Sequence, residues 1–229
     1  MADRPYTNPL DGLYEIVGDL WNMQKLEEAA AKKQDPSSSA AGETAPAAPK
    51  AAQVPAELPS FDQIWQTADE TIDWTDILSG RNTMGLDPLS PRWKFLRQHA
   101  EKVLAGSLTD YAEVLREVRP LDDMKKYAHH IRVRALSPDE ITVTYEAFEE
   151  DAADNATAYE HYLCGIALRC ARDVFAVLPV THVQVTASAA GKQQLHVRFI
   201  RSDMQKTLFN FIDPVDFVRD LGAEITLDA

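Results

Sequence analysis

The longest amphipathic stretch of the chain runs from Thr157 to Pro179. Apolar side chains recur there at steps of three and four residues, which places them on one face of an α-helix: Tyr159, Leu163, Ile166, Cys170, Val174 and Val177. The charged side chains of Arg169, Arg172 and Asp173 lie off this stripe. Because proline disfavours helical backbone in the residue before it, Pro179 marks the end of the helix. The pattern predicts a helix of about 20 residues that needs a broad apolar surface to cover.

Strand-like segments flank this helix on both sides. Apolar and polar residues alternate over 130–136 and 140–148, and again over 181–187 and 194–200, and a short turn segment separates the members of each pair. The order β-β-α-β-β predicts an α+β fold, with a four-stranded antiparallel sheet and the long helix on one face. Residues 224–227 are compatible with a further edge strand.

The remainder of the chain divides into three parts. Residues 1–33 are predicted to form an amphipathic helix, and the Ala-, Pro- and Ser-rich residues 34–58 a flexible linker. Residues 59–229 form the α+β domain, in which 59–127 is a helical part that includes a helical pair, and 128–229 is the β-β-α-β-β part with C-terminal helices. The N-terminal helix is predicted either to pack on the same chain, to pair with a second copy, or to bind a partner.

The segment 59–80 has an unusual composition. It contains two tryptophans and five acidic residues and no basic residue. Tryptophan prefers sites that are apolar at one end and polar at the other, and the acidic residues complement a positive surface. We expect this segment to lie on a basic, partly apolar surface.

Net charge limits the classes of partner. The chain carries a formal charge of -13, although residues 91–134 have 10 basic and 6 acidic side chains. This balance argues against nonspecific nucleic-acid binding by the whole chain. No apolar run approaches the roughly 20 residues of a transmembrane helix, and the N-terminal sequence lacks the pattern of a signal peptide. We therefore expect a cytoplasmic protein that does not bind membranes, with Cys164 and Cys170 as small core residues.

The C-terminal half resembles a known sequence pattern. A helix that ends with Phe175, Leu178 and Pro179 is followed by two strands and then by Ile212, Asp213 and Pro214. In this order, residues 120–229 are similar to the C-terminal domain of uncharacterised bacterial proteins, mostly from Gram-positive bacteria and associated with mobile elements. The resemblance implies an architecture and no reaction, and no site residue carries over from it.

The sequence contains few patterns typical of catalytic or metal-binding sites. The chain has no phosphate loop, dinucleotide-binding fingerprint, nucleophile elbow or H-E-x-x-H sequence. His129 and His130 are neighbours in a predicted strand and point to opposite faces, so they cannot easily share a metal. Asp122 and Asp123 fit either a metal site or, more simply, the start of a helix. We predict no catalytic residues, metal or cofactor.

One group of polar residues is a candidate site. Pairing Val133 with Val143 in the first hairpin, and His182 with Arg198 in the second, predicts a polar second face of the sheet. The candidate ligand-binding residues on it are His130, Arg132, Arg134, His182, His196 and Arg198, next to Thr142, Thr144, Glu146 and Gln184. Such a face either is solvated, or is covered by the acidic segment 59–80, or binds an external anion or acidic peptide.

These observations favour a non-enzymatic, cytoplasmic protein-interaction module. In this hypothesis the α+β domain is the rigid body, and the N-terminal helix recruits a protein partner. The alternative is an enzyme or a binder of a phosphate-bearing ligand or nucleic acid, acting through the Arg/His-rich face. An enzyme needs polar groups that converge in a pocket, which a flat sheet face does not supply.

Overall fold

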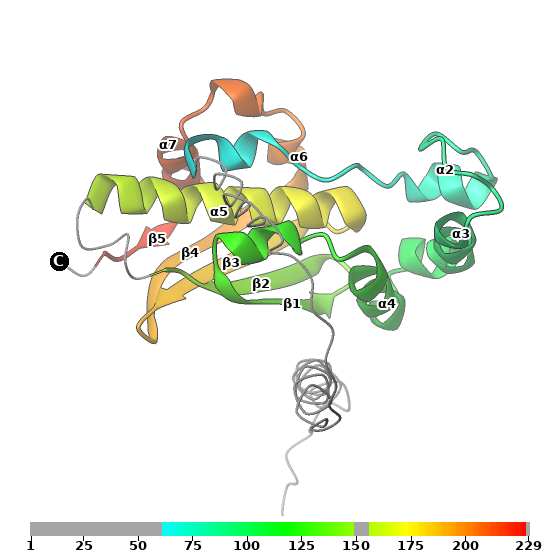
Figure 1. The fold of residues 1–229 in the computed structure, drawn as a ribbon, viewed down its shortest axis with the longest axis horizontal. Helices are drawn as coiled ribbons and strands as arrows, with labels where there is room; N and C mark the ends of the chain where they lie inside the picture. The colour runs from blue at the N-terminus through cyan, green and yellow to red at the C-terminus, as the bar shows by residue number, and fades with distance from the viewer. Residues whose placement is uncertain (1–60, 149–155, 228–229) are drawn as a thin grey trace, which may run out of the picture. The chain divides into compact units, whose positions relative to one another are not determined.

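The computed structural model describes residues 61–148 and 156–227 (Figure 1). The helix and linker predicted for residues 1–33 and 34–58 lie outside these ranges. In chain order the elements, with η for a 3-10 helix, are η1 (Phe61–Gln66), α2 (Trp74–Ser79), α3 (Pro91–Leu104), α4 (Leu108–Val118), η2 (Asp123–Lys126), β1 (His129–Ser137), β2 (Glu140–Glu146), α5 (Ala156–Val177), β3 (His182–Ala189), β4 (Lys192–Ile200), α6 (Arg201–Met204), η3 (Phe209–Phe211), α7 (Pro214–Asp220) and β5 (Glu224–Ile225).

The fold is α+β, as predicted, but the sheet differs from the predicted one. It has five strands in the order β1-β2-β3-β4-β5, and β5 occupies part of the segment expected as a further edge strand. The prediction of an entirely antiparallel sheet is wrong, because β2 and β3 are parallel neighbours. The cause is the connection between them. The 22 residues of α5 span about 33 Å, which returns the chain to the end of the sheet where β2 began.

The first hairpin has the predicted register. Val133 lies opposite Val143, and Arg132 and Arg134 lie opposite threonines of β2. An irregularity interrupts the pairing on either side of this central part, between His129 and Arg132 and between Ala135 and Ser137. His130 lies in the first of them and has a left-handed backbone conformation, with φ of 47°. Regular pairing in β1 is therefore confined to a few residues around Val133.

The second hairpin is shifted from the predicted register. Arg198 lies opposite Gln184, and not opposite His182. The prediction was wrong by two residues because the turn is the two-residue Ala190-Gly191 and the pairing shifts near Ala187. Both turn residues have positive φ, as the tightest hairpin turns require. A shift of two residues preserves the alternation of faces, so the polar side chains stay on the predicted side.

Helix α5 is buried on nearly all sides, and not only along the predicted stripe. One side packs on β2, β3 and β4, while η1 and α7 cover other sides (Figure 1). Cys164 and Cys170 are fully buried and unpaired, and burial raises the pKa of the Cys164 thiol to about 12. Both cysteines are core residues, as expected. Gly165 lets η1 approach, since a Cβ atom there would lie 3.2 Å from the ring of Trp65.

The predicted helical pair consists of α3 and α4. Ser90 caps α3, and Ser107 caps α4. The pair contacts the turn between β1 and β2. The Tyr111 hydroxyl donates a hydrogen bond of 3.0 Å to the carbonyl of Pro138. Gly106, with φ of +78°, approaches the same proline so closely that a Cβ atom would lie 2.6 Å from it.

Candidate functional site

Two surfaces of the described domain carry clusters of arginine. The first is on α5, where residues 61–74, called the strap here, run along the helix. Main-chain groups hold the strap at its C-terminal end. The Ile72 amide donates to the Ala176 carbonyl at 2.8 Å, and the Trp74 indole donates to the Val177 carbonyl at 2.7 Å. The strap therefore lies on the helix layer, and the hypothesis that segment 59–80 covers the polar sheet face is wrong for its described residues.

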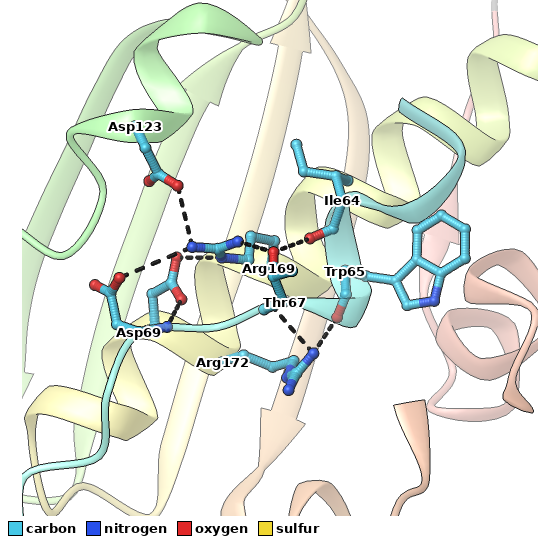
Figure 2. A network of polar contacts seen from close by, with 8 residues as sticks. Ile64, Trp65, Thr67, Asp69, Asp123, Arg169 and Arg172 are labelled. Carbon is cyan, nitrogen blue, oxygen red and sulfur yellow. Dashed lines mark hydrogen bonds and ion pairs between the residues drawn. The ribbon is translucent and has the colours of Figure 1, made fainter. Parts of the chain in front are cut away.

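Two arginines of α5 bind the middle of the strap (Figure 2). Arg172 donates hydrogen bonds to the carbonyls of Trp65 and Thr67, and its guanidinium stacks 3.9 Å from the centre of the Phe209 ring. Arg169, one turn earlier, donates to the Thr67 hydroxyl. The expectation that the acidic, tryptophan-containing segment lies on a basic, partly apolar surface is thus confirmed for the strap, which lies on the outer side of α5, whereas α2 packs on α3.

Arg169 also forms ion pairs with three carboxylates. It contacts Asp173 at 2.7 Å, Asp123 at 3.1 Å and Asp69 at 3.8 Å (Figure 2). The Asp173 side chain is fully buried, and the Asp69 amide donates to it at 2.9 Å. Burial raises the pKa of Asp173 from 3.8 to about 7, against the opposing effect of Arg169. These residues come from the strap, η2 and α5, so the cluster joins three segments that are distant in the sequence.

The cluster serves as a structural clasp. Asp123 forms an ion pair with Arg169, and its neighbour Asp122 contacts Lys125 at 2.5 Å, so both carboxylates considered as metal ligands from the sequence have basic partners. No group of three or more histidine, cysteine, aspartate or glutamate residues with metal-binding geometry occurs within 61–148 and 156–227. The buried charges of the cluster are directed at one another, which fixes the strap on α5.

The second surface is the polar face of the sheet, formed by alternate residues of β1 to β5. Cross-strand pairing aligns them in two central rows: Arg134, Thr142, Gln184 and Arg198 in one, and Arg132, Thr144, Thr186, His196 and Glu224 in the other. All three arginines are exposed and the other residues of the predicted face are exposed or half-buried. No described element covers this face.

Acidic residues divide the polar face into parts of different charge. Arg198 lies 3.5 Å from Glu140, and the His130 ring lies 2.5 Å from Glu146. Arg132 makes no side-chain hydrogen bond or ion pair with the described residues. On β1, Arg132 therefore carries a positive charge that no described acidic side chain balances.

The remaining two candidate residues contact hydroxyl groups. The Nδ1 atom of His196 lies 2.9 Å from the Thr186 hydroxyl, across the strand pair. The Nδ1 atom of His182 lies 2.8 Å from the hydroxyl of Thr181, its neighbour in the chain. His182 is at the start of β3, one row beyond Arg198, so the six candidates share a face but do not converge on one point.

The sequence interpretation missed the clasp and some members of the polar face, among them Glu140, Thr186 and Glu224. Glu140 and Thr186 lie within the predicted strands, so applying the alternation to each whole strand would have included them. The spacing of Arg169 and Asp173, one helical turn apart, was the only local signal of a buried pair. Their burial depends on the strap, which is about a hundred residues away in the chain.

Comparison with known proteins adds no assignment. No protein-family model matches the chain, and no curated protein or solved structure matches it significantly. The resemblance of residues 120–229 to uncharacterised bacterial domains stays a prediction. Among the helices within the described ranges, none is both long enough and apolar enough to cross a membrane.

Proposed function

We propose that this protein is a non-enzymatic protein-interaction module and that the polar face of its sheet binds an acidic segment of a partner protein. The observation that carries the proposal is the exposure of Arg132, Arg134 and Arg198 in adjacent rows of a face that no described element covers. A guanidinium group offers several donors in a planar arrangement, which suits carboxylates. Threonine and glutamine side chains between the arginines supply further hydrogen-bonding groups.

The arrangement of charge favours a protein over a nucleic acid. Glu140 and Glu146 lie among the basic residues, and Glu224 ends the row of Arg132. A phosphate backbone needs positive charge at regular intervals, and acidic groups between the contacts repel it. The charge of -13 on the whole chain opposes a polyanion further. A peptide can place an acidic residue at an arginine and a neutral or basic residue at a glutamate.

Geometry also favours binding over catalysis. Side chains of one sheet face lie side by side at strand spacings of about 4.8 Å and project in the same direction. General acid–base or nucleophilic catalysis requires groups that converge on one reacting atom. The exposed, aligned groups described above suit recognition of an extended surface.

The proposal is tested by capture followed by titration. Full-length protein is used to capture partners from a nuclease-treated lysate of its native cells, and a captured protein is then purified and titrated. We expect Arg132→Ala/Arg198→Ala to weaken its binding about tenfold or more, the size expected when two charged contacts are removed. The matched control is Arg116→Ala/Arg119→Ala, which removes two exposed arginines from the end of α4 and should leave the affinity unchanged.

Two results would overturn the proposal. One is equal affinity of the sheet-face variant and the wild-type protein for every captured partner. The other is binding of a single-stranded oligonucleotide that weakens steeply with salt and is lost in the sheet-face variant, because that result would assign the face to nucleic acid.

A further inference from the structure

The outer edge of β1 is a sheet edge to which another strand could be added. β1 pairs with β2 on one side, and no described segment pairs with its other side. At the opposite edge of the sheet, the two-residue β5 pairs with Leu195 and His196 of β4. An edge strand presents backbone N–H and C=O groups that can pair with another chain. β1, with nine residues, is the edge available for such pairing.

The two faces of β1 differ in the side chains that they offer to an added strand. On the helix side, Ile131, Val133 and Ala135 are only partly buried, whereas Ile141 and Val143 of the neighbouring β2 are fully buried. Apolar surface next to an open edge is stabilised when a further strand covers it. The helix side of β1 thus favours apolar residues in the partner.

The other side of β1 favours acidic residues. Arg132 and Arg134 are exposed there, and successive residues on one strand face lie about 7 Å apart. Arg198 of β4 contacts Glu140 and His130 of β1 contacts Glu146, whereas Arg132 makes no side-chain ion pair with the described residues. Residues of opposite charge on directly paired strand positions stabilise a sheet. A strand beside β1 would satisfy Arg132 with an acidic side chain.

We propose that the edge of β1 binds an extended segment of a partner protein in which apolar and acidic residues alternate, so that the segment becomes a sixth strand of the sheet. Its apolar side chains cover Ile131, Val133 and Ala135, and its acidic side chains pair with Arg132 and Arg134. This inference rests on the proposed function and specifies the mode of binding. Irregular pairing at both ends of β1 limits the regular contact to Arg132, Val133, Arg134 and Ala135.

A second copy of this chain fits the edge less well. If two β1 strands paired antiparallel with their polar faces aligned, Arg132 would lie opposite Arg134 when Val133 is on the two-fold axis. If Arg132 is on the axis instead, Arg134 lies opposite His130. Like charges on directly opposed positions destabilise a sheet. Charge therefore selects an acidic partner strand over self-pairing.

The experiment uses the full-length chain and synthetic peptides. The probe is an acetylated, amidated peptide that alternates valine and glutamate over seven residues, and the control peptide has lysine in place of glutamate. Affinities are measured by calorimetry, and protection of β1 amides by hydrogen exchange. We expect the glutamate peptide to bind about tenfold more tightly than the lysine peptide, and alternate amides within 131–135 to exchange more slowly in its presence.

Variants separate edge pairing from binding elsewhere on the face. Arg132→Glu should weaken binding of the glutamate peptide and strengthen that of the lysine peptide, each by about tenfold. The matched control is Arg116→Glu, at an exposed arginine of α4 outside the sheet, and should change both affinities little. Both arginines are exposed, so both variants should fold with wild-type melting temperatures.

Three results would overturn the inference. If Arg198→Glu weakens binding as much as Arg132→Glu and the β1 amides stay unprotected, the ligand lies across the face; the proposed function then survives without the edge pairing. If neither peptide binds, the edge does not accept such a strand, and the captured-partner titration still decides the proposed function separately. The third result is a free protein that forms dimers, with Arg132→Asp making the dimer more stable. In that variant the new carboxylate of one copy would pair with Arg134 of the other, so the edge would serve self-association.

Discussion

Within residues 61–148 and 156–227 there are two arginine-rich surfaces: the one on α5 is covered, and the one on the sheet is exposed. Arg169 and Arg172 of α5 are covered by the strap, an acidic and aromatic segment of the same chain. Arg132 and Arg134 of β1 are exposed. The α5 surface shows what such a surface accepts in this protein: a 3-10 helix and an irregular segment held largely through main-chain groups, with the Asp69 carboxylate near Arg169 and apolar side chains beside it.

The difference lies in how completely each surface is desolvated. Ile64 and Trp65 of the strap are buried beside Gly165, so the arginine contacts next to them are shielded from water. Shielding strengthens the contacts between paired charges and makes each unpaired charge more costly. On the sheet, the exposed ion pairs contribute little to stability. The α5 surface is therefore predicted to determine stability and the sheet surface to determine binding.

Replacing Arg169 by leucine should cause the largest loss of unfolding free energy and therefore tests the division of roles between the two surfaces most strongly. The change leaves the fully buried Asp173 without its partner, and removal of one member of a buried pair costs about 3–5 kcal/mol of unfolding free energy. The measurement is urea unfolding at pH 8. Arg132→Leu, on the sheet, is the control and should change stability by less than about 0.5 kcal/mol. Equal effects of the two changes would contradict the division of roles.

The pH dependence of stability tests the clasp more finely. The unfolded chain releases the Asp173 proton near pH 3.8, whereas the folded protein retains it up to about pH 7. Between these values the folded state binds more protons, so this group's contribution to stability falls as the pH rises, by up to about 1.4 kcal/mol per unit.

Asp173→Asn isolates this contribution, because asparagine does not titrate. We expect the difference in unfolding free energy between wild type and variant to vary with pH between about 4 and 7 and to be constant above that range. Parallel curves for the two proteins over this interval would show that Asp173 has an ordinary pKa.

The smallest expected change in unfolding free energy comes from the turn between β3 and β4, which lies outside both arginine-rich surfaces. Ala190 has φ of 48°, a conformation that asparagine tolerates better than alanine. Ala190→Asn should raise unfolding free energy by about 0.5–1 kcal/mol while leaving both arginine surfaces unchanged. Thermal unfolding provides the measurement. Ala189→Asn is the control; it places an amide at a buried strand position and should lower stability.

Local patterns explain which parts of the fold the sequence predicted. Alternation along a strand depends only on neighbouring residues, so the pairing of Val133 with Val143 and the membership of the polar face followed from it. The register of Arg198 depended on the length of one turn, which Ala190 and Gly191 shorten by adopting positive φ. Alanine is an uncommon residue in that conformation, so the sequence did not indicate the turn type.

Contacts between distant segments explain what the sequence did not predict. The parallel pairing of β2 with β3 joins strands from different hairpins, and no local pattern specifies it. The burial of Arg169 and Asp173 depends on Thr67 and Asp69, which lie about a hundred residues earlier. Helical periodicity assigns such charged residues to a solvent face, because it takes no account of a second layer packed on the helix.

Amide hydrogen exchange of the free, full-length protein tests the central claim most directly, since it reads both surfaces in one experiment. The account predicts that alternate amides within β1 exchange rapidly because they face an open edge, while the amides of Asp69 and Ile72, which are hydrogen-bonded to α5, are strongly protected. Uniform protection along β1, or rapid exchange at Asp69 and Ile72, would contradict it.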